Sequence, residues 1–252
     1  MSPGPSVLIE AASLTDVGLV RERNEDAFGE KSLAGGRLFV VADGMGGHAG
    51  GATASRLAVE AVEAALGTIP RDAPRALREA LEAANRSIHD ESRRDPSLRG
   101  MGTTGVALLI GSGGCWVANV GDSRAYRLRQ NRFKQLTRDH SQVEELVKLG
   151  LLDREEAESH PASNVITRAV GAMDDLKIDM ISGDLHDRDI YLICSDGLNK
   201  EVPDAEIGQI LQSGSCEDSA RALIDRALDY GARDNVTAIV VQVEEQDGSP
   251  AY

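Results

Sequence analysis

Acidic residues stand at the ends of several apolar segments in this chain of 252 residues. They are Asp43 after LFVVA, Asp122 after WVANVG, Asp196 after YLICS, Asp234 before NVTAIVV, and the pair Glu25-Asp26 before Ala27-Phe28. One such aspartate alone is usually only a turn residue. Adjacent strands bring their ends to a common edge of a sheet, so the recurrence predicts a cluster of carboxylates, which would repel one another without a counter-ion. A bound cation would remove this repulsion.

The ligand types favour Mg²⁺ or Mn²⁺ over Zn²⁺. Every candidate ligand is an oxygen atom, and hard divalent cations prefer oxygen. The five histidines show neither an HExxH motif nor another short metal-ligand spacing, although zinc sites usually include such residues. No loop of alternating acids typical of an EF-hand occurs, so calcium in that form is not expected.

Three other chemistries do not fit the sequence. A cysteine phosphatase needs an arginine six residues after its nucleophile, and none of the three cysteines has one there. The serine-hydrolase motif GxSxG has only a near miss at residues 121–125. The segment GMGGHA at residues 44–49 has the form of a dinucleotide-binding loop, but Asp43 directly before it would repel a pyrophosphate.

The composition excludes further classes of protein. The chain has 27 Lys and Arg against 41 Asp and Glu, a formal net charge of −14, so neither nucleic acid nor an anionic membrane surface is an expected partner. An aromatic content of 3% speaks against stacking of bases on the protein. The odd number of widely spaced cysteines indicates reduced thiols, and the N-terminal residues lack the positive start of a signal peptide. We therefore expect a cytoplasmic protein.

Short apolar segments would position the acids. Segments of strand type span residues 7–9, 37–42, 106–110, 115–120, 125–128, 190–194 and 236–243, and helical periodicity occurs at residues 52–66, 74–88 and 219–230. The stretch 102–121 has no charge but contains six glycines, so we interpret it as a buried hairpin and not as a membrane span. Several strands follow one another without intervening helices, which predicts an α+β fold with largely antiparallel strands.

A polar insertion is expected before the last third of the chain. Ser141 with Glu144, and Asp153 with Glu156, have the spacing of capping boxes, so residues 144–170 are predicted to form a helical insertion. His140 is expected only to lead into its first helix. Neither a repeat nor a linker divides the sequence, so a single domain is predicted over residues 1–252, with its core at about 7–244 and a disordered tail at 245–252.

Six blocks of the sequence resemble the metal-dependent protein phosphatase family, the type 2C serine/threonine phosphatases. The blocks are RERNED at 21–26, VADGMGGH at 41–48, GTT at 102–104, ANVGDSR at 118–124, CSDGL at 194–198 and RDNVT at 233–237. They occur in the family's order between residues 16 and 243, and the form DGMGGH resembles the bacterial branch.

The resemblance implies a fold and a metal centre. The fold is a central antiparallel β-sandwich flanked by α-helices on both sides (α-β-β-α), with a helical flap, and two Mn²⁺ or Mg²⁺ ions lie at one end of the sandwich. The implied ligands are Asp43 bridging both ions, Asp196 and Asp234 on one ion, the Gly44 carbonyl and the Glu25-Asp26 pair on the other, and Asp122 at a third, weaker ion. Which member of the Glu25-Asp26 pair contacts metal directly is left open.

The resemblance also implies a mechanism. The guanidinium of Arg21 would bind phosphate oxygens, and a water or hydroxide bridging the two metals would attack phosphorus without a covalent enzyme intermediate. Animal relatives carry a histidine, the proposed proton donor, where this chain has Met45. His48 is therefore one candidate acid, with a metal-bound water as an alternative and a purely structural role for His48 as another. Residues 144–170 resemble the mobile flap beside the active site, the expected seat of substrate selection.

The expected function is hydrolysis of phosphoserine and phosphothreonine in proteins by a cytoplasmic enzyme, a monomeric catalytic domain. Its expected partners are phosphorylated proteins and the serine/threonine kinases that it opposes, with no nucleic acid and no membrane. One alternative is a catalytically silent member that binds phosphoproteins, and another is a phosphatase of a small phosphorylated metabolite. The presence of Asp43, Asp196 and Asp234 favours an active enzyme over the first alternative.

Overall fold

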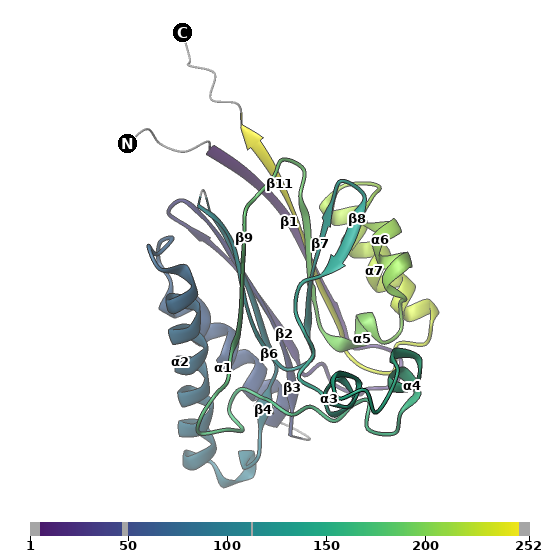
Figure 1. Cartoon of the computed structure of the whole chain (residues 1–252). Helices are drawn as coiled ribbons and strands as arrows, with labels where there is room; N and C mark the ends of the chain where they lie inside the picture. Colours follow the sequence, from purple (N-terminus) through teal and green to yellow (C-terminus); the bar gives the residue numbers. More distant parts are fainter. Residues whose placement is uncertain (1–5, 47–49, 112, 247–252) are drawn as a thin grey trace.

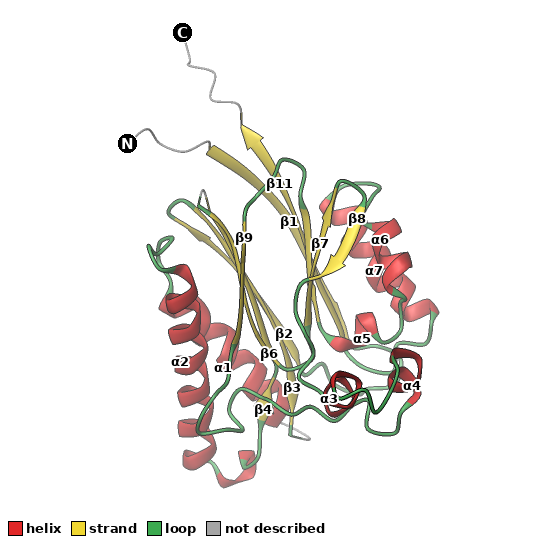
Figure 2. Cartoon of the chain, viewed as in Figure 1, coloured by secondary structure: helices red, strands yellow, loops and turns green. Residues whose placement is uncertain are grey.

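Two antiparallel β-sheets pack face to face and carry helices on both outer sides (Figure 1). The computed structural model describes residues 6–46, 50–111 and 113–246. Figure 2 shows the resulting order of layers, with strands inside and helices outside. The predicted α+β sandwich flanked by helices is confirmed.

The strands of each sheet come from distant parts of the chain. The first sheet contains, in spatial order, β1 (Ser6–Asp16), β11 (Val236–Gln246), β10 (Ile190–Cys194), β7 (Arg124–Arg129) and β8 (Arg132–Gln135). The second contains β2 (Asp26–Leu33), β3 (Gly36–Met45), β5 (Gly105–Gly111), β6 (Gly114–Val120) and β9 (Asp179–Gly183), with the short β4 (Gly102–Thr103) paired to β3. Strands β5 and β6 pair directly with each other, as predicted for the charge-free stretch.

Helices cover the outer face of each sheet. Helices α1 (Gly50–Ala65) and α2 (Ala73–Arg94) pack on the second sheet, and α5 (Asp196–Asn199), α6 (Asp204–Ile210) and α7 (Cys216–Asp229) lie on the side of the first. The sequence of α2 explains its position. At the start of the helix, the Asp72 side chain accepts a hydrogen bond from the Arg75 amide, and Leu77, Leu81 and Ile88 lie on its buried face. No helix in the described ranges is long and apolar enough to cross a membrane.

Alternation along β3 divides the core and sets the direction of a key acid. Leu38, Val40 and Ala42 pack with helices α1 and α2, whereas Phe39 and Val41 pack between the sheets. Successive side chains of a strand point to opposite faces. Asp43 therefore continues the inward series of Phe39 and Val41 at the end of the sandwich.

Several boundaries differ from the sequence predictions. Strands β2, β4, β8 and β9 and helices α5 and α6 were not predicted. Strand β1 is longer than expected, and β11 continues two residues into the predicted tail, to Gln246. The insertion is helical only in α3 (Gln142–Lys148) and α4 (Arg154–Ser159), each of which begins at a predicted capping residue. Residues 160–170 contain only turns and two isolated bridges, Ser141 to Ile166 and Thr103 to Val170.

Candidate metal centre

A cavity of about 570 Å³ opens at one end of the sandwich, where the predicted acids gather. Its lining includes Arg21, Glu25, Asp43, Gly44, Asp122, Asp196 and Asp234. Asp26 lies beside this lining, directly opposite Asp43 in the β2–β3 pair. His48, the candidate proton donor, lies outside the described residues.

Asp26 connects the two sheets beside this cavity. Its Oδ2 atom accepts hydrogen bonds from Ser195 Oγ and Thr237 Oγ1, both at 2.6 Å, and both donors belong to the first sheet's side of the sandwich. Its Oδ1 atom is buried and has no hydrogen-bond partner among the residues that the structure describes. One oxygen thus fixes the carboxylate in place while the other remains available as a ligand.

The backbone of Asp43 is held by two threonines. The Asp43 amide donates to Thr104 Oγ1 at 2.9 Å, and the Asp43 carbonyl accepts from Thr103 Oγ1 and from the Thr104 amide, each at 2.8 Å. Thr104 Oγ1 also contacts Ser123 Oγ at 2.7 Å. The GTT block therefore positions the acid, a role that sequence reasoning did not assign.

The turn at Gly44 requires glycine because of close backbone approach. The Gly44 amide donates to the Glu25 carbonyl at 3.1 Å. A Cβ atom at Gly44 would overlap the carbonyl oxygens of Gly51 and Glu25, and a Cβ atom at Gly51 would overlap the Glu25 carboxylate. The glycine-rich segment thus packs the start of α1 against the acid pair, and the antiparallel sheet around it lacks the βαβ context of a dinucleotide site.

Asn235 clamps the N-terminal loop to Asp234. The backbone amide of Asn235 donates to Asp234 Oδ1 at 2.9 Å. Its side-chain Oδ1 accepts from the backbone amide of Glu25 at 2.8 Å, and its Nδ2 donates to the Val17 and Arg23 carbonyls, each at 2.9 Å. This role was also missed from the sequence, although Asn235 lies within the RDNVT block.

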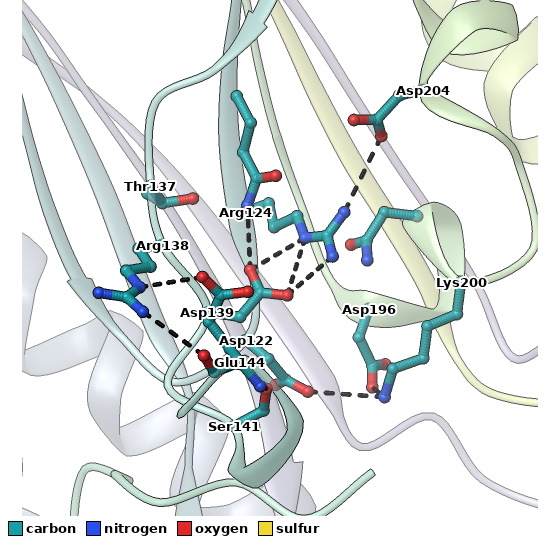
Figure 3. Close-up of polar contacts among 12 residues, drawn as sticks. Asp122, Arg124, Thr137, Arg138, Asp139, Ser141, Glu144, Asp196, Lys200 and Asp204 are labelled. Atoms are coloured by element: carbon teal, nitrogen blue, oxygen red, sulfur yellow. Dashed lines mark hydrogen bonds and ion pairs between the residues drawn. The ribbon is translucent and has the colours of Figure 1, made fainter. Parts of the chain in front are cut away.

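Two cationic side chains contact three of the acids. Arg21 Nη2 lies 2.7 Å from Asp234 Oδ2, and Lys200 Nζ contacts Asp196 Oδ2 and lies 3.5 Å from Asp122 Oδ2 (Figure 3). Asp196 Oδ1, like Asp26 Oδ1, is buried without a hydrogen-bond partner from the described part of the chain. Lys200 follows Asp196 by four residues, a spacing that could have indicated this contact.

The burial of several carboxylates in one place changes their proton affinities. Burial, and then the neighbouring carboxylates of Asp196 and Asp26, raise the pKa of Asp43 well above its usual value. Burial is also the main reason why the pKa values of Asp26 and Asp122 rise to about 7. Such shifts mean that the site holds more negative charge than its environment stabilises.

The donor set fits hard divalent cations. Two buried carboxylate oxygens without partners, at Asp26 and Asp196, lie in a group of acids that can supply only oxygen ligands, which is the chemistry of Mg²⁺ and Mn²⁺. Among the described residues, no three acid, histidine or cysteine side chains form a closed ligand set. Asp234 Oδ2 is paired with Arg21 and Asp196 Oδ2 with Lys200. An ion would therefore compete with Arg21 at Asp234 and would reach Asp196 through its unpaired Oδ1 atom.

His140 supports the Asp122 turn. Its Nδ1 atom accepts a hydrogen bond from the Gly121 amide at 3.1 Å, and its Nε2 atom lies 3.2 Å from Asp179 Oδ2. The ring is buried, and burial lowers its pKa. It therefore does more than lead into a helix, because it fixes the backbone directly before Asp122.

Comparison with known proteins places this architecture in a family. The family model for protein phosphatase 2C matches residues 20–239, and the chain belongs to this family. The serine/threonine phosphatase Stp of Listeria welshimeri is 37% identical over 235 residues, covering 90% of this chain and 93% of its own length.

Solved structures agree closely with the fold. The crystal structure of the Mycobacterium tuberculosis serine/threonine phosphatase PstP/Ppp superposes with a TM-score of 0.88 at 37% identity, over 94% of this chain and 99% of that one. A structure of the PstP catalytic domain in complex with two manganese ions gives a TM-score of 0.84 at 36% identity, over 95% of this chain and all of that one (100%).

Proposed function

We propose that this protein is a metal-dependent serine/threonine protein phosphatase, which hydrolyses phosphoserine and phosphothreonine in proteins with two Mn²⁺ or Mg²⁺ ions. The observation that carries this proposal is the cluster of Asp26, Asp43 and Asp196 at the cavity, in which the Oδ1 atoms of Asp26 and Asp196 are buried without a partner among the described residues. The manganese bound by the related PstP domain supports the same choice of ion.

The proposed ligand roles follow the positions of the acids. Asp43 would contact both ions, Asp196 and Asp234 would serve one, and the Gly44 carbonyl with the Glu25-Asp26 pair would serve the other. When bound, the ions would polarise the phosphoryl group and lower the pKa of water. Asp26, fixed by Ser195 and Thr237, would keep its free oxygen aimed at the centre.

Arg21 is the proposed phosphate-binding residue. Its side chain is 54% exposed and lines the cavity beside Asp234, so the guanidinium can turn toward a phosphate dianion and bind it through two nitrogens. In a chain of net charge −14, such a group is needed to attract a doubly negative substrate. His48 stays a candidate proton donor.

The proposal extends to the place of this enzyme in the cell. We place the enzyme in the cytoplasm as a monomeric catalytic domain that opposes serine/threonine kinases. Residues 144–170 would form the flap that selects among phosphoproteins, since this segment borders the cavity through Asn164 and Ile166.

Release of phosphate from a phosphothreonine peptide tests the proposal. We expect turnover with Mn²⁺, loss of turnover after EDTA treatment, recovery when Mn²⁺ is restored, and little activity on sugar phosphates. Binding of the peptide without any turnover in Mn²⁺ would favour the catalytically silent alternative, and preference for sugar phosphates would favour the metabolite phosphatase.

A further inference from the structure

Lys200 lies at a corner of the site where three separate segments meet. It caps the C-terminal end of α5, and its amide donates to the Asp196 carbonyl at 2.9 Å. This single helical turn brings the lysine side chain back over Asp196. Its Nζ atom contacts Asp196 Oδ2, lies 3.5 Å from Asp122 Oδ2 and donates to Asn164 Oδ1 at 2.8 Å.

The two carboxylates at this corner need a cation between them. The side chains of Asp122 and Asp196 are only 6% and 13% exposed, so solvent screens their mutual repulsion poorly. Within the described part of the chain, Lys200 is the cationic group that pairs with Asp122 (Figure 3). Its three ammonium hydrogens match the three oxygens that surround it.

A third metal ion bound between Asp122 and Asp196 would use the same carboxylate oxygens. An ammonium already hydrogen-bonded to them occupies the space between them, and a dication beside it would face electrostatic repulsion. A third ion and the Lys200 ammonium are therefore competing occupants of one position.

We propose that Lys200 is a built-in cation of this enzyme, which takes the place of a third metal ion and ties the segment 160–167 to the metal centre through Asn164. The proposal rests on the proposed function, because it presupposes a centre for two ions. Lys200 acts as a positioning residue: it holds Asp122 and Asp196 together and links the metal centre to the predicted flap.

The contacts around Asn164 explain how one lysine could control that segment. Asn164 is exposed, but its neighbours are anchored, since the Gln142 amide donates to the Val165 carbonyl at 2.8 Å and the Thr167 amide donates to the His140 carbonyl at 2.7 Å. The Lys200 bond adds a side-chain link from this loop directly to the acids.

The number of Mn²⁺ ions bound per chain, measured by equilibrium dialysis and by native mass spectrometry, tests the metal part of the proposal. We expect two for the wild type, three for Lys200→Ser and two for the charge-conserving Lys200→Arg. Lys134→Ser, an exposed lysine on β8, is the matched control and should bind two. Three ions on the wild type, or two on Lys200→Ser, would overturn the proposal, whereas no bound ion on the wild type would overturn the proposed function itself.

Hydrogen exchange of residues 160–167 in the metal-free protein tests the link to the flap. Loss of one anchoring bond to an exposed loop should accelerate local opening by about tenfold in Lys200→Ser and in Asn164→Ala. Asn164→Ala should still bind two Mn²⁺ ions, because it keeps the Lys200 charge. This variant therefore distinguishes the hydrogen bond to Asn164 from the effect of the lysine charge on metal binding. Unchanged exchange in both variants would contradict the link, and circular dichroism would verify that each variant is folded.

Discussion

Asp43 is the residue on which the other groups of the site converge. It extends the inward face of β3, lies opposite Asp26 and is fixed through its backbone by Thr103 and Thr104. Burial among other carboxylates gives it a strongly raised pKa. This environment is unfavourable for an isolated acid and suits one whose charge is compensated by cations.

Asp43→Asn removes that charge with little change in shape. We expect kcat to fall by at least about 10³ when Mn²⁺ is saturating, because in the proposed centre Asp43 would hold the ions that supply the nucleophile and the charge that stabilises the transition state. Initial-rate kinetics on a phosphothreonine peptide measure the effect, with Asp90→Asn on the exposed surface of α2 as control. Near-normal turnover in Asp43→Asn would refute its role.

At the level of elements, the site is a set of strand ends held in register by turns. Glycine at position 44 lets β3 pass the start of α1 and the Glu25 backbone at close range. Asn235 then ties the loop of Val17 and Arg23 to β11. The geometry of the site thus depends on close backbone contacts between elements. A side chain in place of Gly44 would push the two backbones apart.

Gly44→Ala tests this dependence on close approach. A Cβ atom would overlap two backbone carbonyls that cannot move independently, so we expect a loss of about 2–4 kcal/mol in the free energy of unfolding, with weaker Mn²⁺ binding. Gly67→Ala is the control, because no described residue beyond its chain neighbours lies within 4 Å of its Cβ position, and it should change stability by less than about 1 kcal/mol. Urea denaturation measures both variants, and equal stabilities would show that the approach at Gly44 is not a constraint.

The strands that periodicity found and those that it missed differ in their position in the sheet. Central strands such as β3 and β5 are apolar on both faces, which makes them visible as continuous runs. The missed strands β2, β8 and β9 are partly exposed edge strands with mixed polar residues. β2 and β8 pair with the adjacent strands β3 and β7, and β9 pairs with the distant β6. Because one face of an edge strand is partly exposed, none of the three forms a continuous apolar run that local sequence would reveal.

The candidate site was predictable to the extent that its residues are acids. Strand ends identified Asp43, Asp196 and Asp234, and family resemblance added Arg21 and Gly44. Neutral groups that orient these acids, such as Thr104 and Asn235, and the cation Lys200 carry no ligand signature of their own. Their roles emerge only when the folded chain brings the elements together.

At the scale of the whole molecule, the acids form the joint between the two sheets. Asp26 and Asp43 come from the second sheet, whereas Ser195, Thr237 and Asp196 come from the side of the first. An ion that binds carboxylates from both sides connects the halves of the sandwich. Metal binding should therefore stabilise the entire fold, and not only a loop near the cavity.

This connection predicts a thermal shift that depends on both metal and pH. An Mn²⁺ concentration of 100 times Kd adds about 2.7 kcal/mol per site, which for a domain of this size corresponds to a rise in Tm of about 5–10 °C. The folded-state pKa values of Asp26 and Asp122 are raised to about 7, so the metal-free protein loses stability as pH rises from about 4, the unfolded pKa, through about 7. Below a pH of about 7, protons bound to these carboxylates compete with the ions. Differential scanning fluorimetry should therefore show a larger Mn²⁺-induced rise in Tm at pH 8 than at pH 5.5. The Asp43→Asn variant should lose most of this rise. If Asp43→Asn showed the same rise as the wild type, manganese would bind at a place other than the acids between the two sheets.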